Sequence, residues 1–74
     1  MNKAERLLQI VNLLRSRRTA MTAAQLSDRL GVSQRTIYRD VQALTLSGIS
    51  VEGEAGVGYQ IRAGGSIPPL MFTP

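Results

Sequence analysis

The sequence predicts a mainly α-helical domain that ends in a small β-hairpin. Three segments carry apolar residues at the helical spacing of three and four positions, and capping residues or glycines bound them. After Gly48 the apolar residues alternate with polar ones, which is typical of strands. A chain of 74 residues supports only one small hydrophobic core, so these elements belong to a single domain.

The first helix is expected over about residues 3–17. Asn2 is placed to cap its N-terminus, and Glu5 three positions later approximates a capping box. The apolar stripe of this helix consists of Leu7, Ile10, Val11 and Leu14. Leu8 and Leu13 flank the stripe, so they either widen the core face or meet a second subunit, and we favour the core.

A second helix should begin at the capping box formed by Thr22 and Gln25 and end at Gly31. In the turn Gly31-Val32-Ser33 the glycine can adopt the left-handed conformation, the valine can pack inward and the serine can cap the next helix. The third helix is expected over about residues 34–46, before Gly48. Its buried face is predicted to contain Ile37, Val41 and Leu44.

A hairpin should follow the third helix. Its first strand is predicted at residues 49–52, where Ile49 and Val51 alternate with polar residues, and its second strand at residues 59–62. Glycines between the strands favour a turn. Residues 1–62 therefore form the expected domain. Residues 63–74 are rich in glycine and proline, which favours a connector toward a C-terminal domain missing from this sequence.

The composition argues against an enzyme. The absence of cysteine and histidine excludes disulfides, thiolate nucleophiles, the commonest general base and the usual ligands of structural zinc. A chain of this size can hardly enclose a substrate pocket. We therefore expect no catalytic residue, no metal site and no cofactor. The sequence also lacks a run of roughly 18 apolar residues and a signal-peptide pattern, so we expect a cytoplasmic protein with no membrane partner.

The charge distribution favours a polyanionic partner. Nine lysines and arginines against five acidic residues give a net charge of +4. Residues 1–18 hold most of the excess, with five cations against Glu5, whereas residues 49–74 are slightly acidic. A nucleic acid fits this distribution, although an ordinary basic domain would share the same net charge.

Two short helices joined by a glycine-containing turn form the helix-turn-helix pattern, a spacing that any small helical hairpin can share. The outer surface of the third helix favours DNA binding over a plain helical hairpin. At about 100° per residue, Arg35, Arg39 and Gln42 lie opposite its apolar residues, and the small Thr36 and Ala43 lie beside them. Arginine and glutamine can form bidentate hydrogen bonds to guanine and adenine. We predict that Arg35, Thr36, Arg39 and Gln42 read bases in the major groove of double-stranded DNA.

Phosphate contacts are predicted from the end of the first helix and the starts of the next two: Arg17, Arg18, Thr22, Ser33, Gln34 and Tyr38. Structural alternatives stay open for several of them. The arginines, with Arg15, can simply complement a helix dipole, Ser33 is also a cap, and Tyr38 can pack its ring on the core. Arg39 and Asp40 can form a solvated pair. We interpret Asp40 as structural, either orienting an arginine or lying beside the contact.

Helix-turn-helix followed by a glycine-rich hairpin is the winged helix-turn-helix fold, with three helices and a two-stranded wing. Gly56, Gly58 and Tyr59 are the candidate wing contacts, although Glu52 and Glu54 weaken an approach to the minor groove. Residues 26–41, above all the run VSQRTIYRD at 32–40, resemble the recognition segment of DeoR-type and WYL-domain bacterial transcriptional regulators. The resemblance continues through Leu44, Gly48, Gly58-Tyr59 and the IPPL motif at 67–70, while Val57 interrupts the two adjacent glycines that often precede the wing tyrosine.

This resemblance implies a bacterial DNA-binding domain that regulates transcription at an operator or promoter in the nucleoid. It also implies a ligand-sensing, WYL-like C-terminal domain after the connector and a homodimer or higher oligomer of the full-length protein. The alternatives are a winged-helix protein-interaction module and the regulatory head of a larger enzyme, as in biotin-ligase repressors. Single-stranded RNA binding is disfavoured, because the three aromatic residues are too few and too scattered for a stacking platform.

Overall fold

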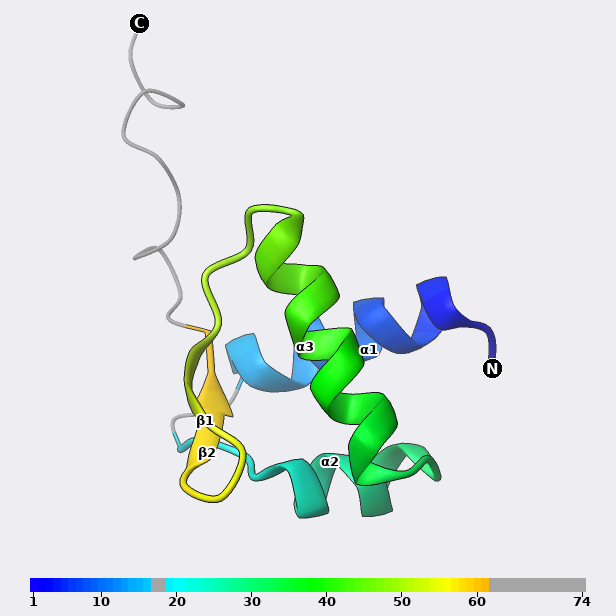
Figure 1. Cartoon of the computed structure of the whole chain (residues 1–74), viewed down its shortest axis with the longest axis horizontal. Coiled ribbons are helices and arrows are strands. Elements are labelled where there is room, and N and C mark those ends of the chain that lie inside the picture. Colours follow the sequence, from blue (N-terminus) through cyan, green and yellow to red (C-terminus); the bar gives the residue numbers. More distant parts are fainter. Residues whose placement is uncertain (17–18, 62–74) are drawn as a thin grey trace, which may run out of the picture.

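The computed structural model describes residues 1–16 and 19–61, and it contains three helices followed by a two-stranded antiparallel sheet (Figure 1). The elements are α1 (Lys3–Ser16), α2 (Ala23–Leu30), α3 (Gln34–Leu46), β1 (Glu52–Glu54) and β2 (Gly58–Gln60). Their order and type confirm the predicted winged helix-turn-helix fold. None of the described helices is long and apolar enough to cross a membrane.

The N-termini of α1 and α2 are capped as the sequence predicts. The side chain of Asn2 accepts a hydrogen bond of 2.8 Å from the backbone N–H of Glu5. Thr22 and Gln25 form a reciprocal capping box, with hydrogen bonds of 3.1 Å from the Gln25 N–H to the Thr22 hydroxyl and 2.9 Å from the Thr22 N–H to the Gln25 side chain. These bonds satisfy backbone donors that a helix start otherwise leaves unpaired.

The turn between α2 and α3 is fixed by its own residues. Gly31 ends α2 in the left-handed conformation (φ 68°), which side chains other than glycine rarely adopt. The hydroxyl of Ser27 donates to the carbonyl oxygen of Val32, and the Val32 side chain packs against the core. Ser33 then caps α3 by accepting a hydrogen bond of 3.1 Å from the Thr36 N–H. The angle between the two helices is therefore set locally.

The core collects one face of each helix together with β2. Its buried apolar residues are Ile10, Leu14, Met21, Ala23, Leu26, Leu30, Ile37, Val41, Leu44, Tyr59 and Ile61. Leu13 packs against this cluster, as expected of a residue that widens the core face. The same expectation was wrong for Leu8, whose exposed fraction is 63%, because Leu8 lies on the outward side of α1.

A charged pair borders this apolar interior, with Asp40 buried and Arg6 half-buried. Asp40 is the buried polar residue of α3, with an exposed fraction of 1%, and both of its carboxylate oxygens accept hydrogen bonds from Arg6 of α1. The Arg6 Nη2 bond measures 3.0 Å, and the Nε atom donates to the second oxygen. These hydrogen bonds, supported by the charge of Asp40, raise the pKa of Arg6. Two-point contact between a guanidinium and a carboxylate fixes both side chains.

The hairpin begins later than the sequence predicts. Ile49 and Val51 pack against the core but precede β1, which spans Glu52–Glu54 rather than residues 49–52. The physical reason is local, because the Ile49 N–H donates to the carbonyl oxygen of Leu44 (3.0 Å) and completes the end of α3 instead of a strand pair. β2 spans Gly58–Gln60, and Arg62 from the predicted second strand lies outside the described residues, as does the predicted connector.

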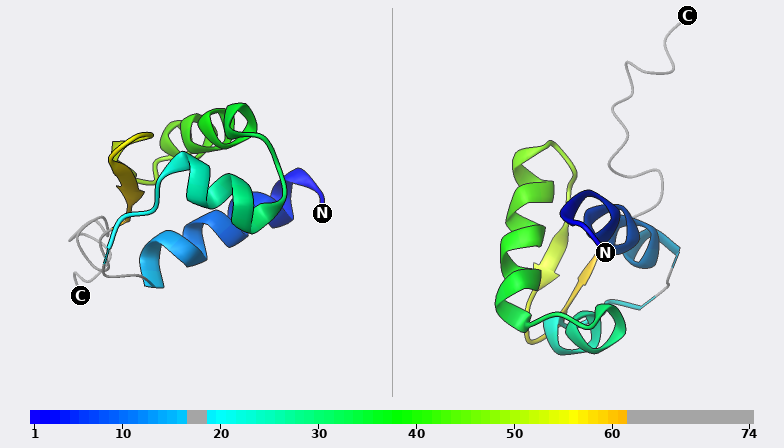
Figure 2. Two further views of the ribbon diagram at one scale, coloured as in Figure 1. Left: turned by 90° about the horizontal axis from the view of Figure 1, so that it is seen from below. Right: turned by 90° about the vertical axis from the view of Figure 1, so that its right-hand side faces the viewer.

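Backbone hydrogen bonds attach the hairpin to the start of α2. Met21 and Tyr59 exchange two of them, at 2.9 and 2.6 Å, and the Ala23 N–H donates to the carbonyl oxygen of Ala55 (3.0 Å). Gly58 allows this close approach, because a Cβ atom there would lie 2.6 Å from the Cβ of Ala20. The hairpin runs from the level of α1 to the level of α3 (Figure 2, left), and β2 contacts α1, where the Ile61 N–H donates to the carbonyl oxygen of Leu14 at 3.4 Å.

Removing Arg6 should destabilise the domain by leaving the Asp40 carboxylate buried and unpaired. We expect Arg6→Met to lower the free energy of unfolding by about 3 kcal/mol. The double variant Arg6→Met/Asp40→Leu should recover most of this loss, because an apolar pair needs no charge partner. Urea unfolding monitored by circular dichroism measures the free energy of unfolding of both variants. A double variant as unstable as the single one would contradict the interpretation that the loss comes from an unpaired buried carboxylate.

Tyr59 should make the domain sensitive to alkaline pH. Burial, supported by the neighbouring Tyr38, raises the pKa of Tyr59 above its usual value of 10.0. Below pH 10, Tyr59 keeps its phenol proton in both the folded and the unfolded state. Above it the unfolded chain loses the proton first, so stability should fall as the pH rises through the folded-state pKa. In urea titrations, the free energy of unfolding should decline less steeply at alkaline pH for Tyr59→Phe than for wild type. The control Tyr38→Phe, which changes an exposed tyrosine, should keep most of the wild-type decline.

Candidate nucleic-acid interface

The outward side of α3 carries a stripe of long polar side chains. Arg35, Arg39 and Gln42 are all exposed, and their spacing of four and three residues places them on one face of the helix. The opposite face is buried in the core. In Figure 1, α3 lies in front of α1, and no other element covers its outer side. The predicted base-reading residues are therefore accessible together, with the half-buried Thr36 at the edge of the stripe.

The arginines of this stripe are not held by carboxylates within the described part of the chain. The alternative of an Arg39–Asp40 pair is not formed, because Asp40 turns inward and pairs with Arg6. The expectation that Asp40 orients an arginine is confirmed, although the arginine comes from α1. Arg39 is thus exposed beside a carboxylate whose charge is already compensated, which leaves the outer face of α3 cationic.

Polar groups cluster at the N-terminus of α3. The Ser33 hydroxyl accepts the Thr36 N–H and donates to the Thr36 hydroxyl, both at 3.1 Å, so it acts as the cap. The Tyr38 hydroxyl donates to the Gln34 side chain at 3.4 Å. With 41% of Tyr38 exposed, its ring does not enter the core. Unpaired N–H groups at a helix start attract anions, so this end of α3 is suited to phosphate oxygens.

The remaining predicted contacts are distributed unevenly. Thr22 is half-buried and its hydroxyl serves the capping box of α2. In the hairpin, Gly56 is exposed at the turn, whereas Gly58 and Tyr59 are buried and hold the hairpin against residues 20–21. The predicted Arg17 and Arg18 lie outside the described residues. Arg15, in the last turn of α1, is exposed.

Sequence reasoning did not single out Arg6. Its partner Asp40 lies 34 positions away, so no local pattern joins the two residues. A signal was nevertheless present in α3. Asp40 follows Ile37 by three positions and precedes Leu44 by four, which places a carboxylate in the buried stripe. A buried carboxylate requires a partner, so the position of Asp40 in the buried stripe implies a positively charged residue from another part of the chain.

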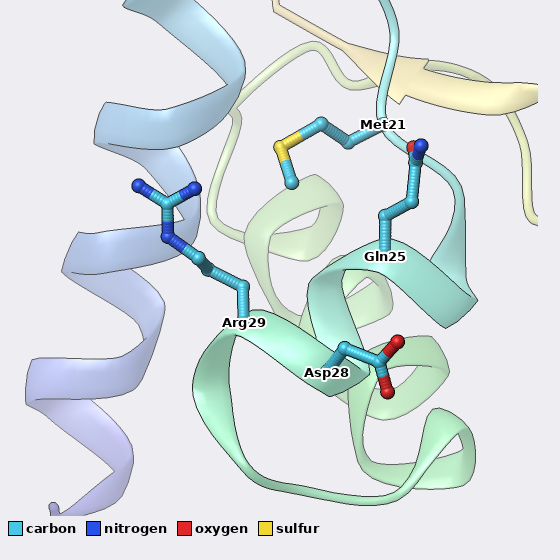
Figure 3. Close-up of a pocket in the computed structure, with 4 residues that line it drawn as sticks. All are labelled: Met21, Gln25, Asp28 and Arg29. Atoms are coloured by element: carbon cyan, nitrogen blue, oxygen red, sulfur yellow. The ribbon is translucent and has the colours of Figure 1, made fainter.

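A second surface feature carries no comparable arrangement. A hollow between α1 and α2 is lined by Met21, Gln25, Asp28 and Arg29 (Figure 3). The Arg29 guanidinium points toward α1 while the Asp28 carboxylate points away from it, so the two charges do not converge on one ligand. Among residues 1–16 and 19–61, no group of three acidic side chains is placed to hold a metal ion.

Comparison with known proteins agrees with this geometry. A family model described as "HTH domain" matches residues 6–60, a range that contains α2, α3 and both strands. The chain is 43% identical over 56 residues to the protein named "Uncharacterized HTH-type transcriptional regulator YobV" of Bacillus subtilis (strain 168). The aligned part covers 76% of this chain but only 18% of that relative. No solved structure matches. Because the family model covers most of the chain, the protein belongs to the family of HTH domains.

Proposed function

We propose that this domain binds double-stranded DNA in a sequence-specific way and regulates transcription. The observation that carries the proposal is the exposed stripe of Arg35, Arg39 and Gln42 on α3. Membership in the HTH domain family supports it, and so does similarity to a relative named as a transcriptional regulator. The net charge of +4 supplies the attraction to a polyanion that such binding needs.

In the proposed complex, α3 lies in the major groove, which is wide enough to admit a helix. Arg35, Thr36, Arg39 and Gln42 then face base edges, where arginine selects guanine and glutamine selects adenine. The capped start of α3, with Ser33, Gln34 and Tyr38, faces the phosphates that border the groove. Arg17, Arg18 and Thr22 stay predicted phosphate contacts, and Gly56 stays the predicted contact of the wing.

We further propose that the domain is the DNA-binding part of a DeoR-type or WYL-domain regulator, with residues 63–74 as the connector to its next domain. The resemblance of residues 26–41 to those regulators supports this assignment, and the relative is much longer than its aligned part. Oligomerisation of the whole regulator would place two copies of α3 on half-sites about one helical turn apart, or at multiples of that spacing.

Truncating Arg35 should change which sequences the domain prefers. Arg35→Ala should weaken binding to the best site by about 1–3 kcal/mol and relax the preference at the base that Arg35 contacts. Selection from a random duplex library, followed by anisotropy on the selected site, measures both effects. Arg29→Ala is the matched control, because it removes the same charge from α2 beside the hollow rather than from the outer face of α3. An unchanged preference in the Arg35 variant would contradict its base-reading role.

Binding to random-sequence duplex should fall steeply as salt increases, because cations that neutralise phosphates release counterions. The slope of log affinity against log salt should therefore be steep, and the double variant Arg35→Ala/Arg39→Ala should bind more weakly than wild type because it removes two cations from the surface that faces the duplex. Fluorescence anisotropy at several salt concentrations measures the slope. Weak binding that is insensitive to salt and to these substitutions would instead favour a protein-interaction module.

A further inference from the structure

The ion pair between Arg6 and Asp40 is not explained by stability alone. Asp40 is buried, and its two carboxylate oxygens accept hydrogen bonds from the Nε and Nη2 atoms of Arg6. Replacing a buried ion pair by apolar side chains of similar volume is often neutral or even stabilising. An apolar residue at position 40 would continue the buried stripe that Ile37 and Leu44 already form. The pair therefore calls for a role besides holding the domain together.

The pair connects α3 to α1, across the side of α3 that faces the interior. The backbone of α3 lies close to that of α2 at more positions than to that of α1, and α3 crosses in front of α1 in Figure 1. The long side chain of Arg6 spans from α1 to Asp40. Near its other end, α1 is bonded to the hairpin through the Leu14 carbonyl oxygen and the Ile61 N–H. Arg6 thus joins α3 to a helix that is itself attached to the hairpin.

The contact of Arg6 with Asp40 is directional, whereas the apolar contacts of α3 are not. Burial of Ile37, Val41 and Leu44 holds this helix in the core, but the hydrophobic effect has no preferred direction. Two parallel hydrogen bonds between a guanidinium and a carboxylate have a defined geometry. A rotation of α3 about its own axis would misalign them. The pair therefore resists a motion that apolar packing resists less.

We propose that Arg6 is a positioning residue for DNA recognition, which acts through Asp40 to hold α3 at the rotation that directs Arg35 and Arg39 to base edges. The inference rests on the proposed function and adds a residue that contacts the inner side of α3 instead of its exposed stripe. Side chains end about 5–6 Å from a helix axis, so a rotation of about 20° moves their tips by about 2 Å.

Such a displacement affects base contacts and phosphate contacts unequally. A hydrogen bond to a base requires a donor–acceptor distance of about 2.7–3.2 Å, so a shift of about 2 Å breaks it. Attraction between a cation and a phosphate extends over about 10 Å at 0.1 M salt and tolerates the same shift. Loss of the Arg6–Asp40 pair therefore reduces the preference for a specific sequence more than it reduces binding to DNA in general.

The double variant Arg6→Met/Asp40→Leu tests this role without changing the net charge, because it removes one cation and one anion. Its affinity is measured by fluorescence anisotropy on two duplexes, one selected by the wild-type domain from a random library and one of random sequence. Circular dichroism checks that the variant is folded at the temperature used. We expect the affinity for the selected duplex to fall at least about fivefold, as for a lost base contact, and that for the random duplex to change less than about twofold.

Arg6→Lys tests the geometry of the pair even if the double variant does not fold. Lysine keeps a positive charge for Asp40 but lacks the planar fork that forms two parallel hydrogen bonds. We expect this variant to stay folded and to lose part of the preference for the selected duplex. Arg29→Lys is the matched control, because it makes the same chemical change on α2, at a side chain that lines the hollow of Figure 3. It should keep the wild-type preference.

Three results would overturn the positioning role. A folded double variant that prefers the selected duplex as strongly as wild type would mean that the pair serves stability alone. Equal losses on both duplexes would mean that the pair supports binding without sequence preference, and equal losses for Arg6→Lys and Arg29→Lys would mean that its geometry is irrelevant. Measuring Arg35→Ala/Arg39→Ala on the same duplexes separates this failure from that of the proposed function. If only the Arg35→Ala/Arg39→Ala variant weakens binding, the proposed function stands and the positioning role does not.

Discussion

The orientation of α3 depends on the ion pair between Arg6 and Asp40. A carboxylate with 1% of its surface exposed is tolerated only beside a partner that compensates its charge and fills its hydrogen-bonding capacity. Turning Asp40 inward toward Arg6 fixes the rotation of α3 about its own axis. The residue before it, Arg39, must then point outward, together with Arg35 and Gln42 on the same face. One buried pair thus connects α1 to the surface proposed to read DNA.

The other constraints on the site are mostly local. The left-handed Gly31 and the Ser33 cap fix how α3 leaves α2, and the Thr22–Gln25 capping box fixes where α2 begins. The wing packs Tyr59 into the core and is also held through backbone hydrogen bonds to the segment before α2. Both parts of the proposed interface are therefore attached to α2: the wing to the start of this helix, and α3 through the turn that follows it.

Positive and negative charges occupy different parts of the surface of this domain, a separation that the net charge does not show. Cations occupy the outer face of α3 and the end of α1, whereas β1 carries the exposed acidic residues Glu52 and Glu54. Asp40 adds a negative charge to α3, and Arg6 of α1 compensates this charge on the inner side of the helix.

Local patterns in the sequence determined most of the fold. The helical spacing of Ile37, Val41 and Leu44, the caps and Gly31 act between residues a few positions apart, so they identified the helices and the outer stripe of Arg35, Arg39 and Gln42. Only the tertiary structure decided three features: Arg6 as the partner of Asp40, the exposure of Leu8, and the start of β1 at Glu52 after Ile49 bonds to the end of α3. Each depends on which distant or competing group occupies the neighbouring space, and periodicity along the chain carries no information about that choice.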